Sequence, residues 1–296
     1  MIWIGLGIGI VLLVLLGYWQ LVIAEGAYLG SRAVTLMYDW SARAYERIKQ
    51  YDSGDEQWFL GLPLSRSLEL IPHPLVLDVA TGTGRLQRAL LRQPGFEGHV
   101  IGLDLSRHML NEAVHRTAQF TDRLTFIWQD AQTIPFDDDT FDAVVCLEAL
   151  EFTPRPKAVL GELVRVLRPG GVLLTTNRVG RDARWLPGKA FPRGTFATLL
   201  ESYPLEDVRV RPWQMDYDLA WAAKRGNPAG GGVRPLSSIL RCPTCRGPMQ
   251  HTDALFICCQ CLRRYPIGED GVIEMEEARR RSPRAGRTAA VQGERS

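Results

Sequence analysis

The chain has 296 residues, of which 46% are hydrophobic and 23% charged, with a formal net charge of +2 at pH 7. A chain of this length and composition can bury a full hydrophobic core and still carry a small accessory unit. The net charge is too small to indicate a nucleic-acid partner by itself, and the absence of a repeat of about 20 to 50 residues excludes a repeat array.

The first 24 residues, MIWIGLGIGIVLLVLLGYWQLVIA, contain no ionisable side chain before Glu25. About 22 apolar residues at a rise of roughly 1.5 Å each reach across a hydrocarbon core of about 30 Å. Trp3, Tyr18 and Trp19 fall near the two ends, where aromatic rings favour the headgroup layer. A cleaved signal peptide would have a basic start and a shorter apolar stretch. We therefore predict an uncleaved transmembrane anchor over residues 1–24.

The charges around this segment predict its orientation. Arg32, Arg43, Arg47 and Lys49 follow the segment, and no basic side chain precedes it. The positive-inside tendency then predicts a single-pass protein of the cell membrane with its downstream domains in the cytoplasm. In that reducing compartment, clustered cysteines favour zinc over disulfides.

Residues 31–50 have the spacing of an amphipathic helix, and short apolar runs then alternate with helical segments. The predicted strands are 74–80, 99–105, 124–130, 141–150 and 171–178, and the predicted helices between them are 84–93, 107–120 and 157–167. This alternation predicts an α/β domain over residues 28–225 with a parallel sheet covered on both faces. Ligands of such sheets bind at the carboxyl ends of the strands.

A glycine-containing loop, DVATGTG, follows the first predicted strand and opens into a helix at Arg85. Gly82 and Gly84 have no β-carbon, so a ligand can lie against bare backbone there. The NAD fingerprint would need a third glycine at position 87, where this chain has Gln87. The Gly-Lys-Ser/Thr of a P-loop is also absent, so a pyrophosphate is not the expected ligand.

Acidic residues close the next two predicted strands. Asp104 stands twenty residues after Gly84, where a carboxylate can accept both hydroxyls of a ribose. Asp130 ends the third strand, where it can accept from the exocyclic amine of adenine. Together with Asp78 they predict a nucleoside ligand with a cationic tail and no phosphate.

The ordered motifs VLDVATGTGRL, VIGLDLS, WQDAQTIPFDDDTFDAVVCLEALEF and ELVRVLRPGGVLLTTNR resemble class I S-adenosylmethionine-dependent methyltransferases. The resemblance is to the ubiquinone and menaquinone biosynthesis branch in particular, and it covers roughly residues 36–225. It implies S-adenosylmethionine as cofactor, a Rossmann-like fold and methyl transfer as the activity. The cofactor-binding residues that it implies are Asp78, Ala80, Gly82, Gly84, Asp104, Leu105, Asp130 and Ala131.

In that resemblance Gly82 and Gly84 face the methionine part, Asp104 binds the ribose, and Asp130 with Ala131 flanks the adenine. Ala80 stands where the family more often has glycine, a departure shared with the quinone-methylating branch. Asp78 is expected to orient the loop amides or to meet the ammonium group through water. Its alternative role is to cap the following helix.

Methyl transfer in this family is an in-line displacement from a sulfonium, which needs mostly positioning and desolvation. The end of the fourth strand lacks the Asn/Asp-Pro-Pro-Tyr motif of enzymes that hold a planar nitrogen, which disfavours adenine and glutamine acceptors. Glu148 and Glu151 are three residues apart and are the only candidates for a general base. The alternative is that both are solvated loop carboxylates, so no catalytic residue is assigned.

Five of the six cysteines lie between residues 242 and 261, after a glycine- and proline-rich stretch predicted as a linker over 226–235. Cys242 with Cys245, and Cys258 with Cys261, form two Cys-x-x-Cys pairs that suit one tetrahedral Zn²⁺. Cys259 does not fit this spacing. Four sulfurs leave no open coordination position, so the zinc would be structural.

Residues 236–276 resemble the zinc-ribbon activator proteins that partner tRNA, rRNA and release-factor methyltransferases. Residues 277–296 are polar and rich in arginine, which predicts a disordered basic tail. The first functional reading is a methyltransferase at the cytoplasmic face of the membrane acting on a small lipophilic or membrane-derived acceptor. An RNA or protein methyltransferase with a fused activator and a non-catalytic cofactor-binding scaffold are the alternatives; the oligomeric state stays open.

Overall fold

The computed structural model describes residues 2–42, 45, 53–228 and 231–276. Arg43, Arg47, Lys49 and the predicted basic tail lie outside the described residues. The helices are α1 Ile2–Tyr18, η1 Trp19–Ile23, α2 Ser31–Ser41, α4 Ser53–Glu56, η3 Gln57–Gly61, α5 Leu62–Ser67, α6 Arg85–Leu91, α7 Arg107–Arg116, η4 Ala118–Arg123, η5 Leu150–Phe152, α8 Pro156–Val166, α9 Gly180–Ala183, α10 Arg193–Glu201 and α11 Leu236–Ile239. The strands are β1 Leu75–Val79, β2 His99–Asp104, β3 Leu124–Trp128, β4 Phe141–Cys146, β5 Leu167–Arg178, β6 Leu205–Gln214, β7 Tyr217–Lys224, β8 Met249–Thr252, β9 Leu255–Cys258, β10 Arg264–Pro266 and β11 Ile273–Glu274.

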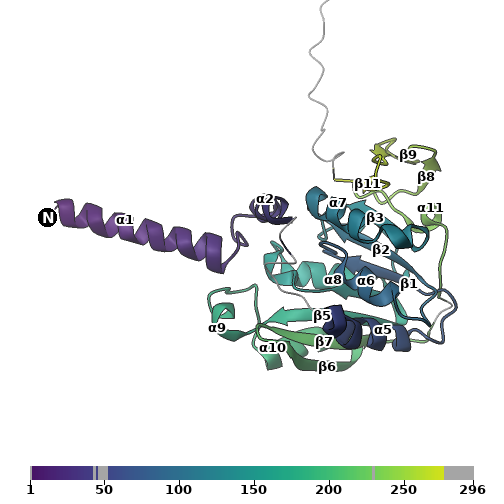
Figure 1. The fold of residues 1–296 in the computed structure, drawn as a ribbon, viewed down its shortest axis with the longest axis horizontal. Helices are drawn as coiled ribbons and strands as arrows, with labels where there is room; N and C mark the ends of the chain where they lie inside the picture. The colour runs from purple at the N-terminus through teal and green to yellow at the C-terminus, as the bar shows by residue number, and fades with distance from the viewer. Residues whose placement is uncertain (1, 43–44, 46–52, 229–230, 277–296) are drawn as a thin grey trace, which may run out of the picture.

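One eight-stranded sheet organises the body of the molecule, with the order β11-β3-β2-β1-β4-β5-β7-β6 (Figure 1). The strands from β11 to β5 pair in parallel, whereas β7 is antiparallel to both β5 and β6. The chain runs outward from β1 to β3 on one side and then returns to β4 on the other side of β1. This order confirms the predicted Rossmann-like fold and places the switch in strand order between β1 and β4.

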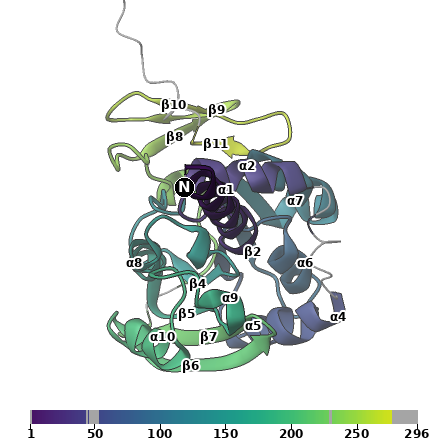
Figure 2. The ribbon, with the colours of Figure 1, turned by 90° about the vertical axis from the view of Figure 1, so that its left-hand side faces the viewer.

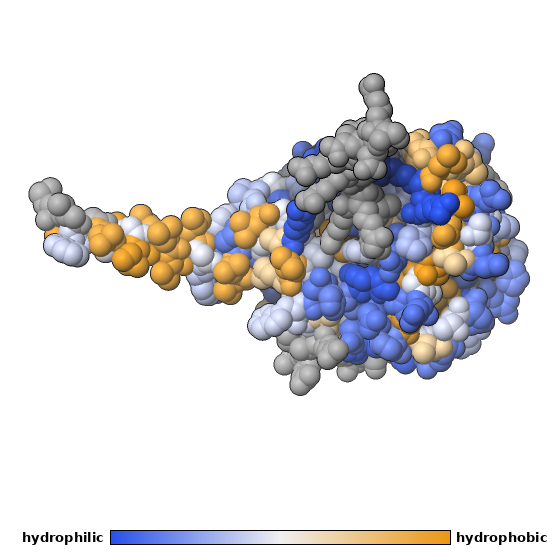
Figure 3. Space-filling model, turned by 90° about the horizontal axis from the view of Figure 1, so that it is seen from above, coloured by the Kyte–Doolittle hydropathy of each residue, from blue (hydrophilic) through white to orange (hydrophobic). Residues whose placement is uncertain are grey.

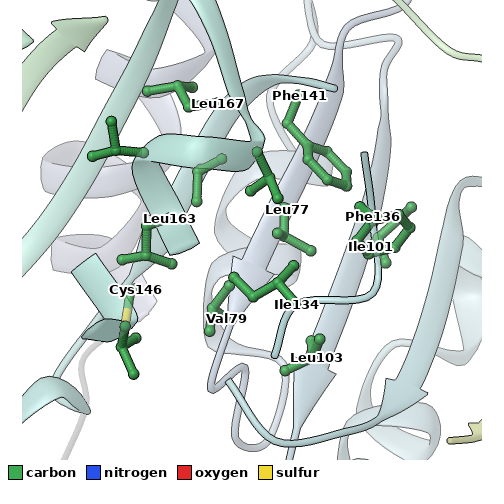
Figure 4. Packing of buried hydrophobic residues seen from close by; sticks show 14 of the residues in the cluster. Leu77, Val79, Ile101, Leu103, Ile134, Phe136, Phe141, Cys146, Leu163 and Leu167 are labelled. Atoms are coloured by element: carbon green, nitrogen blue, oxygen red, sulfur yellow. The ribbon is translucent and has the colours of Figure 1, made fainter. Parts of the chain in front are cut away.

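The apolar runs that predict the strands are the centre of the core. Every residue of β1 and of β4 is buried, which is the pattern of parallel strands covered on both faces. Leu77 and Ile101 of neighbouring strands pack with Leu163 of α8 and with Phe141 in one cluster (Figure 4). Leu90 of α6 belongs to a second cluster that also contains β1 and β2 residues. The sheet is therefore a rigid base for the loops at its carboxyl edge.

The N-terminal helix stands apart from this body. α1 and η1 run without interruption from Ile2 to Ile23 and project away from the sheet (Figures 1 and 2). Among the described residues, the window Leu6–Ile23 is the one helical stretch long and apolar enough to cross a membrane, with a mean hydropathy of 2.3 and none of it buried. A signal sequence near an N-terminus would satisfy the same criteria.

The cysteine-rich region is joined to the main sheet. β8, β9 and β10 form a small antiparallel sheet, whereas β11 pairs in parallel with β3, with Ile273 opposite Ile127. The segment predicted as a flexible linker contacts the interior strand β4, where the Gly232 N–H donates to Asp142 Oδ2 at 2.9 Å. The 226–235 boundary remains a prediction, but the hydrogen-bonded sheet itself continues from the methyltransferase-like region into the ribbon.

Candidate functional site

A cavity of about 780 Å³, its open mouth included, lies at the carboxyl ends of β1, β2 and β4. This is the place that the strand order predicts for a ligand. Its floor comes from the loops after the strands, and its roof comes from α2 and η5. The lining residues are Ser31, Val34, Thr35, Tyr38, Tyr45, Ala80, Gly82, Leu103, Asp104, Leu105, Ser106, Met109, Gln129, Asp130, Ala131, Leu147, Glu148, Ala149, Phe152, Thr153 and Pro154.

Asp104, the last residue of β2, is fixed on the wall of this cavity by two backbone donors. Its Oδ2 accepts from the Gly82 N–H at 2.8 Å and its Oδ1 from the Ser106 N–H at 2.8 Å. Burial raises the pKa of this carboxyl to about 6, although the two backbone donors act in the opposite direction. The remaining lone pairs of a carboxylate held in this way can accept the two hydroxyls of a ribose.

The two glycines of the first loop have different surroundings. Gly82 has a φ of 55°, and a β-carbon there would meet nothing within 4 Å, so its backbone is open to the cavity. Gly84 has a φ of 79°, but a β-carbon there would lie 3.1 Å from Thr117 Cγ2 and 3.4 Å from Ala113 Cβ. The sequence led us to expect both glycines at the ligand. The structure places Gly82 on the cavity, whereas Gly84 allows α6 to start close against α7.

Asp78 braces the loop from beneath. It is 3% exposed, and its Oδ2 accepts from Thr81 Oγ1 at 2.6 Å and from Gln87 Nε2 at 3.0 Å. Burial raises its pKa to about 7 against the effect of these two donors. Asp78 lines a smaller adjoining hollow and does not cap α6, whose N-cap residue is Gly84. Gln87, which the sequence used only to exclude NAD, is thus a structural link between the loop and α6.

The other predicted cofactor residues line the main cavity. Ala80 has a φ of 57°, a conformation that glycine adopts more easily, which fits its place at a usual glycine position. Leu105 accepts from Trp128 Nε1 through its carbonyl at 2.8 Å. Asp130 Oδ1 accepts from the Gln132 N–H at 2.9 Å and lies beside Ala131 on the wall. Six of the eight residues therefore surround one cavity.

The two candidate carboxylates have different positions, and both are buried. Glu148 lines the cavity and forms an ion pair with Arg85, with 2.8 Å between Oε1 and Nη1. Glu151 is 1% exposed, is not on the cavity wall, and its Oε1 accepts from the Tyr217 hydroxyl at 2.5 Å. Burial raises the pKa of Glu151. Neither is the solvated loop carboxylate of the alternative reading, and Glu148 is the one that reaches the ligand space.

The roof of the cavity was not predicted from the sequence. Tyr38 of α2 contacts Phe152 of η5 with 5.7 Å between ring centroids, and both rings line the cavity. Asp39 accepts from Ser106 Oγ at 2.5 Å, which ties α2 to the residue next but one to Asp104. The amphipathic pattern of residues 31–50 was the signal available, but it does not say which surface the apolar face covers.

The four predicted zinc ligands come together in the ribbon. The sulfurs of Cys242, Cys245, Cys258 and Cys261 all lie within 4.8 Å of one another, with 3.3 Å between Cys245 and Cys258. A tetrahedral zinc at about 2.3 Å from each sulfur would place them roughly 3.8 Å apart, so the group fits. All six cysteines are free thiols, and Cys259 is exposed and outside the group.

Comparisons with known proteins agree with this geometry. Residues 76–171 match the family described as "Methyltransferase domain". A demethylmenaquinone methyltransferase of Clavibacter sepedonicus is 36% identical over 138 residues, which are 47% of this chain and 55% of the relative. A ubiquinone/menaquinone biosynthesis C-methyltransferase UbiE of Roseobacter denitrificans is 41% identical over 101 residues, 33% of this chain and 40% of the relative.

Among solved structures, the (4+2)-cyclase SpnF shares the fold with a TM-score of 0.55 and 18% identity, over 67% of this chain and 97% of that one. The chain spans about half the length of the curated relatives it matches. The family match over residues 76–171 falls on the strands and loops that build the cavity. The chain therefore contains a class I S-adenosylmethionine-dependent methyltransferase domain.

Proposed function

We propose that the protein transfers a methyl group from S-adenosylmethionine to a small lipophilic or membrane-derived acceptor, at the cytoplasmic face of a membrane that α1 spans. The observation that supports this most is the roof of the cavity. α2 follows the apolar helix directly, through residues 24–30, and four of its residues line the space beside Asp104. The same element thus links the membrane segment to the ligand space.

The residues present fit the cofactor. Asp104 would accept the ribose hydroxyls, Asp130 and Ala131 would flank the adenine, and the open backbone of Gly82 would take the part toward the sulfur. When bound, the cofactor supplies an electrophilic methyl group on a sulfonium. Asp78, through Thr81 and Gln87, keeps the loop in the shape that this binding needs.

The rest of the cavity suits an apolar acceptor. Val34, Met109, Leu147 and Phe152 line it and exclude water, which leaves positioning as the main contribution of the protein. Glu148 is the carboxylate on this wall, it pairs with Arg85, and it is the candidate to accept a proton from the acceptor. The named substrates of the relatives, menaquinone and ubiquinone precursors, support an acceptor of quinone type.

The placement of α1 supports access from a bilayer. α1 leaves the body beside the carboxyl edge of the sheet (Figure 2), and the cavity lies at the same edge. Arg32 follows the apolar segment among the described residues and favours an inside orientation for the body.

The ribbon is proposed to hold one structural zinc. Cys242 and Cys258 are buried, Cys245 and Cys261 are exposed, and four thiolates leave no position for a reacting water. A unit of this size buries too little apolar surface to fold without metal. The activator-like ribbon would then support the domain to which it is fused.

The experiment that tests the activity is methyl transfer from a labelled donor. Purified protein is incubated with separate lipid, RNA and protein fractions, and we expect label in the lipid fraction only. Asp104→Ala should abolish the product, whereas Asp122→Ala, which removes an exposed carboxylate on η4, should not. Label in RNA or protein would favour the macromolecular acceptors, and no label in any fraction would favour the scaffold.

A second experiment tests Glu148. We predict that Glu148→Gln lowers kcat about 100-fold or more while S-adenosylhomocysteine affinity stays within a few-fold, because a general base acts only in the chemical step. Glu151→Gln is the matched variant, since this residue is also buried but lies off the cavity wall. Equal kcat in wild type and Glu148→Gln would remove the base from the proposal.

A further inference from the structure

Large apolar side chains are exposed around the base of α1. On α2, Trp40 is 93% exposed and Leu36 is 69% exposed, and Trp185, just after α9, is 59% exposed. We call the following group the collar: Tyr28, Leu29, Leu36, Trp40, Trp185 and Met215. Outside α1 and η1, only five other large hydrophobic residues are exposed in the described part of the chain, and they are spread over other surfaces.

The collar is built around the last turns of the apolar helix. Trp19 donates from Nε1 to the carbonyl oxygen of Trp185 at 3.0 Å and stacks on Tyr28 with 5.2 Å between ring centroids. Tyr28 in turn donates to the Pro187 carbonyl oxygen at 2.9 Å. α2 and α9 therefore lie on either side of the point where the helix enters the body (Figure 2).

The third part of the collar is the turn between β6 and β7. Met215 lies in this turn and is 93% exposed, and the neighbouring Asp216 carbonyl accepts from the Val179 N–H at 2.8 Å, just before α9. The apolar surface of α1 continues to the place where the helix meets the body (Figure 3). The collar adjoins the end of the helix through Trp185 and Tyr28, which both contact Trp19.

α2 has the pattern of a helix that lies flat on a bilayer. Arg32, Leu36 and Trp40 repeat every four residues along its exposed side, while Tyr38 points its ring at the cavity. The inner face is used by the ligand space, so the outer apolar face has no protein partner among the described residues. A surface-lying amphipathic helix would bury this face in the headgroup layer.

The depth of these residues follows from Trp19. If the apolar helix ends at Ile23, Trp19 lies about one turn before the end, at the level where tryptophan is enriched in membranes. The hydrogen bond from Trp19 places Trp185 at the same level. Arg181 and Arg184, both exposed next to Trp185, would then meet lipid phosphates.

We infer that the collar is a second membrane contact, which seats the methyltransferase body on the interfacial layer of the leaflet into which α1 inserts. The inference rests on the proposed spanning role of α1. Its partner is the bilayer itself, because the collar adjoins the end of the apolar helix and is flanked by arginines. This contact would bring the cavity, whose lining includes Ser31 and Thr153, close to the leaflet from which a lipophilic acceptor would come.

The test uses the full chain in nanodiscs of phosphatidylcholine and phosphatidylglycerol, with or without brominated acyl chains as quenchers. The emission of one tryptophan is obtained by subtracting the spectrum of its Phe variant from that of wild type. Trp40→Phe and Trp185→Phe report the collar, and Trp58→Phe is the control, since Trp58 is 70% exposed on η3, away from α1. We expect brominated lipid to quench the Trp40 and Trp185 emission at least twofold and to leave Trp58 unchanged.

Three results would overturn the collar. Quenching of Trp40 and Trp185 no greater than that of Trp58 would show that the collar does not contact lipid. Quenching of only one of them would show that the contact exists on only one side of α1. Protection of both from aqueous acrylamide without quenching by lipid would indicate a protein partner instead. Failure of the spanning role is distinguishable, because the chain would then not elute with the discs.

Discussion

The N-terminal segment and the C-terminal ribbon both join the body at the carboxyl edge of the sheet, where the candidate cofactor cavity lies, but through different kinds of contact. The C-terminal ribbon joins through backbone hydrogen bonds: β11 pairs with β3, and the Met275 and Glu276 N–H groups both donate to the Trp128 carbonyl. The N-terminal segment joins through side chains, such as Glu25 with Arg178. Backbone pairing depends little on side-chain identity, whereas single side-chain contacts can be broken one at a time. The ribbon is thus part of the sheet, whereas the N-terminal segment is a roof held by side-chain contacts.

The N-terminal segment and the ribbon also both contact one short turn, at Ser106 and Arg107. Ser106 contacts the roof through Asp39, and Arg107 forms ion pairs with Asp270 at 2.8 Å and Glu274 at 3.3 Å in the ribbon. This turn follows Asp104, the proposed ribose ligand. Substitutions in either segment are therefore expected to change cofactor affinity, but by different amounts.

The largest effect is expected from a zinc ligand. Cys242→Ser should lose the metal and unfold the ribbon, because structural zinc contributes on the order of 10 to 16 kcal/mol to such units. Metal analysis should find one zinc per chain in wild type and in Cys259→Ser, and none in Cys242→Ser. Zinc retained in Cys242→Ser, or absent from reduced wild type, would contradict the site.

The comparison becomes sharper if cofactor affinity is measured in the same variant. The glycine-rich stretch before the ribbon predicts that affinity survives the loss of zinc, whereas the shared sheet predicts that it falls. We expect weaker S-adenosylhomocysteine binding in Cys242→Ser by calorimetry, because β3 loses its partner strand next to Asp104. Unchanged affinity would show that cofactor binding does not depend on the pairing of β11 with β3.

The next effect in size is expected at the turn itself. Asp104→Ala removes the acceptor for two hydroxyls and should weaken S-adenosylhomocysteine binding by about 2 to 4 kcal/mol, roughly 30- to 700-fold. Asp122→Ala is the matched control and should bind like wild type. Calorimetry at pH 7.5 measures both, and equal affinities would move the ribose site elsewhere.

A smaller effect is expected from pH. With a pKa of about 6, Asp104 changes from mostly neutral at pH 5 to mostly ionised at pH 7, so cofactor affinity should rise about tenfold over this range. Its contribution to stability has the opposite direction: it is fully present below about pH 3.8 and is lost as pH rises through 6. The variant Asp78→Asn distinguishes the effect of Asp104 from that of Asp78, because the pKa of Asp78 is about 7. If cofactor affinity still rose with pH in Asp104→Ala, another titrating group would cause the rise.

The smallest effects compare the two attachments directly. The side chains of Glu25 and Arg107 are similarly exposed, at 27% and 26%. Glu25→Gln weakens contacts to Arg178 and Tyr38 and should speed amide exchange in α2 about 5- to 30-fold. Arg107→Gln should change exchange in β3 and β11 less than about threefold, because the backbone pairing remains. Equal changes in both regions would remove the distinction between roof and sheet.

Much of the structure could be predicted from local sequence patterns. Apolar periodicity located β1 to β4 and α6 to α8 within a few residues, and strand ends located Asp104 and Asp130. Cysteine spacing alone selected the four sulfurs that the fold brings together. These features depend on residues close in sequence or on the general rule for parallel sheets.

The unpredicted features depend on contacts between distant residues. The pairing of Ile273 with Ile127 needs two short segments far apart in the chain, and neither has a pattern that names the other. The burial of Glu151 depends on Tyr217, which begins a strand 66 positions later. Gly84 has the same residue type as Gly82, yet only the packing of α7 decides that it faces away from the cavity.

The pairing of β11 with β3 also has a consequence for synthesis. β3 is an edge strand until residues 273–274 are added, and these follow every other strand of the sheet in chain order. Under the proposed spanning role of α1, this helix would already be in the membrane while that edge was still open. An unpaired edge strand is a template for association with other chains. Truncation shortly before residue 273 should therefore give neighbouring nascent chains on the same membrane a strand to pair with, so that they aggregate.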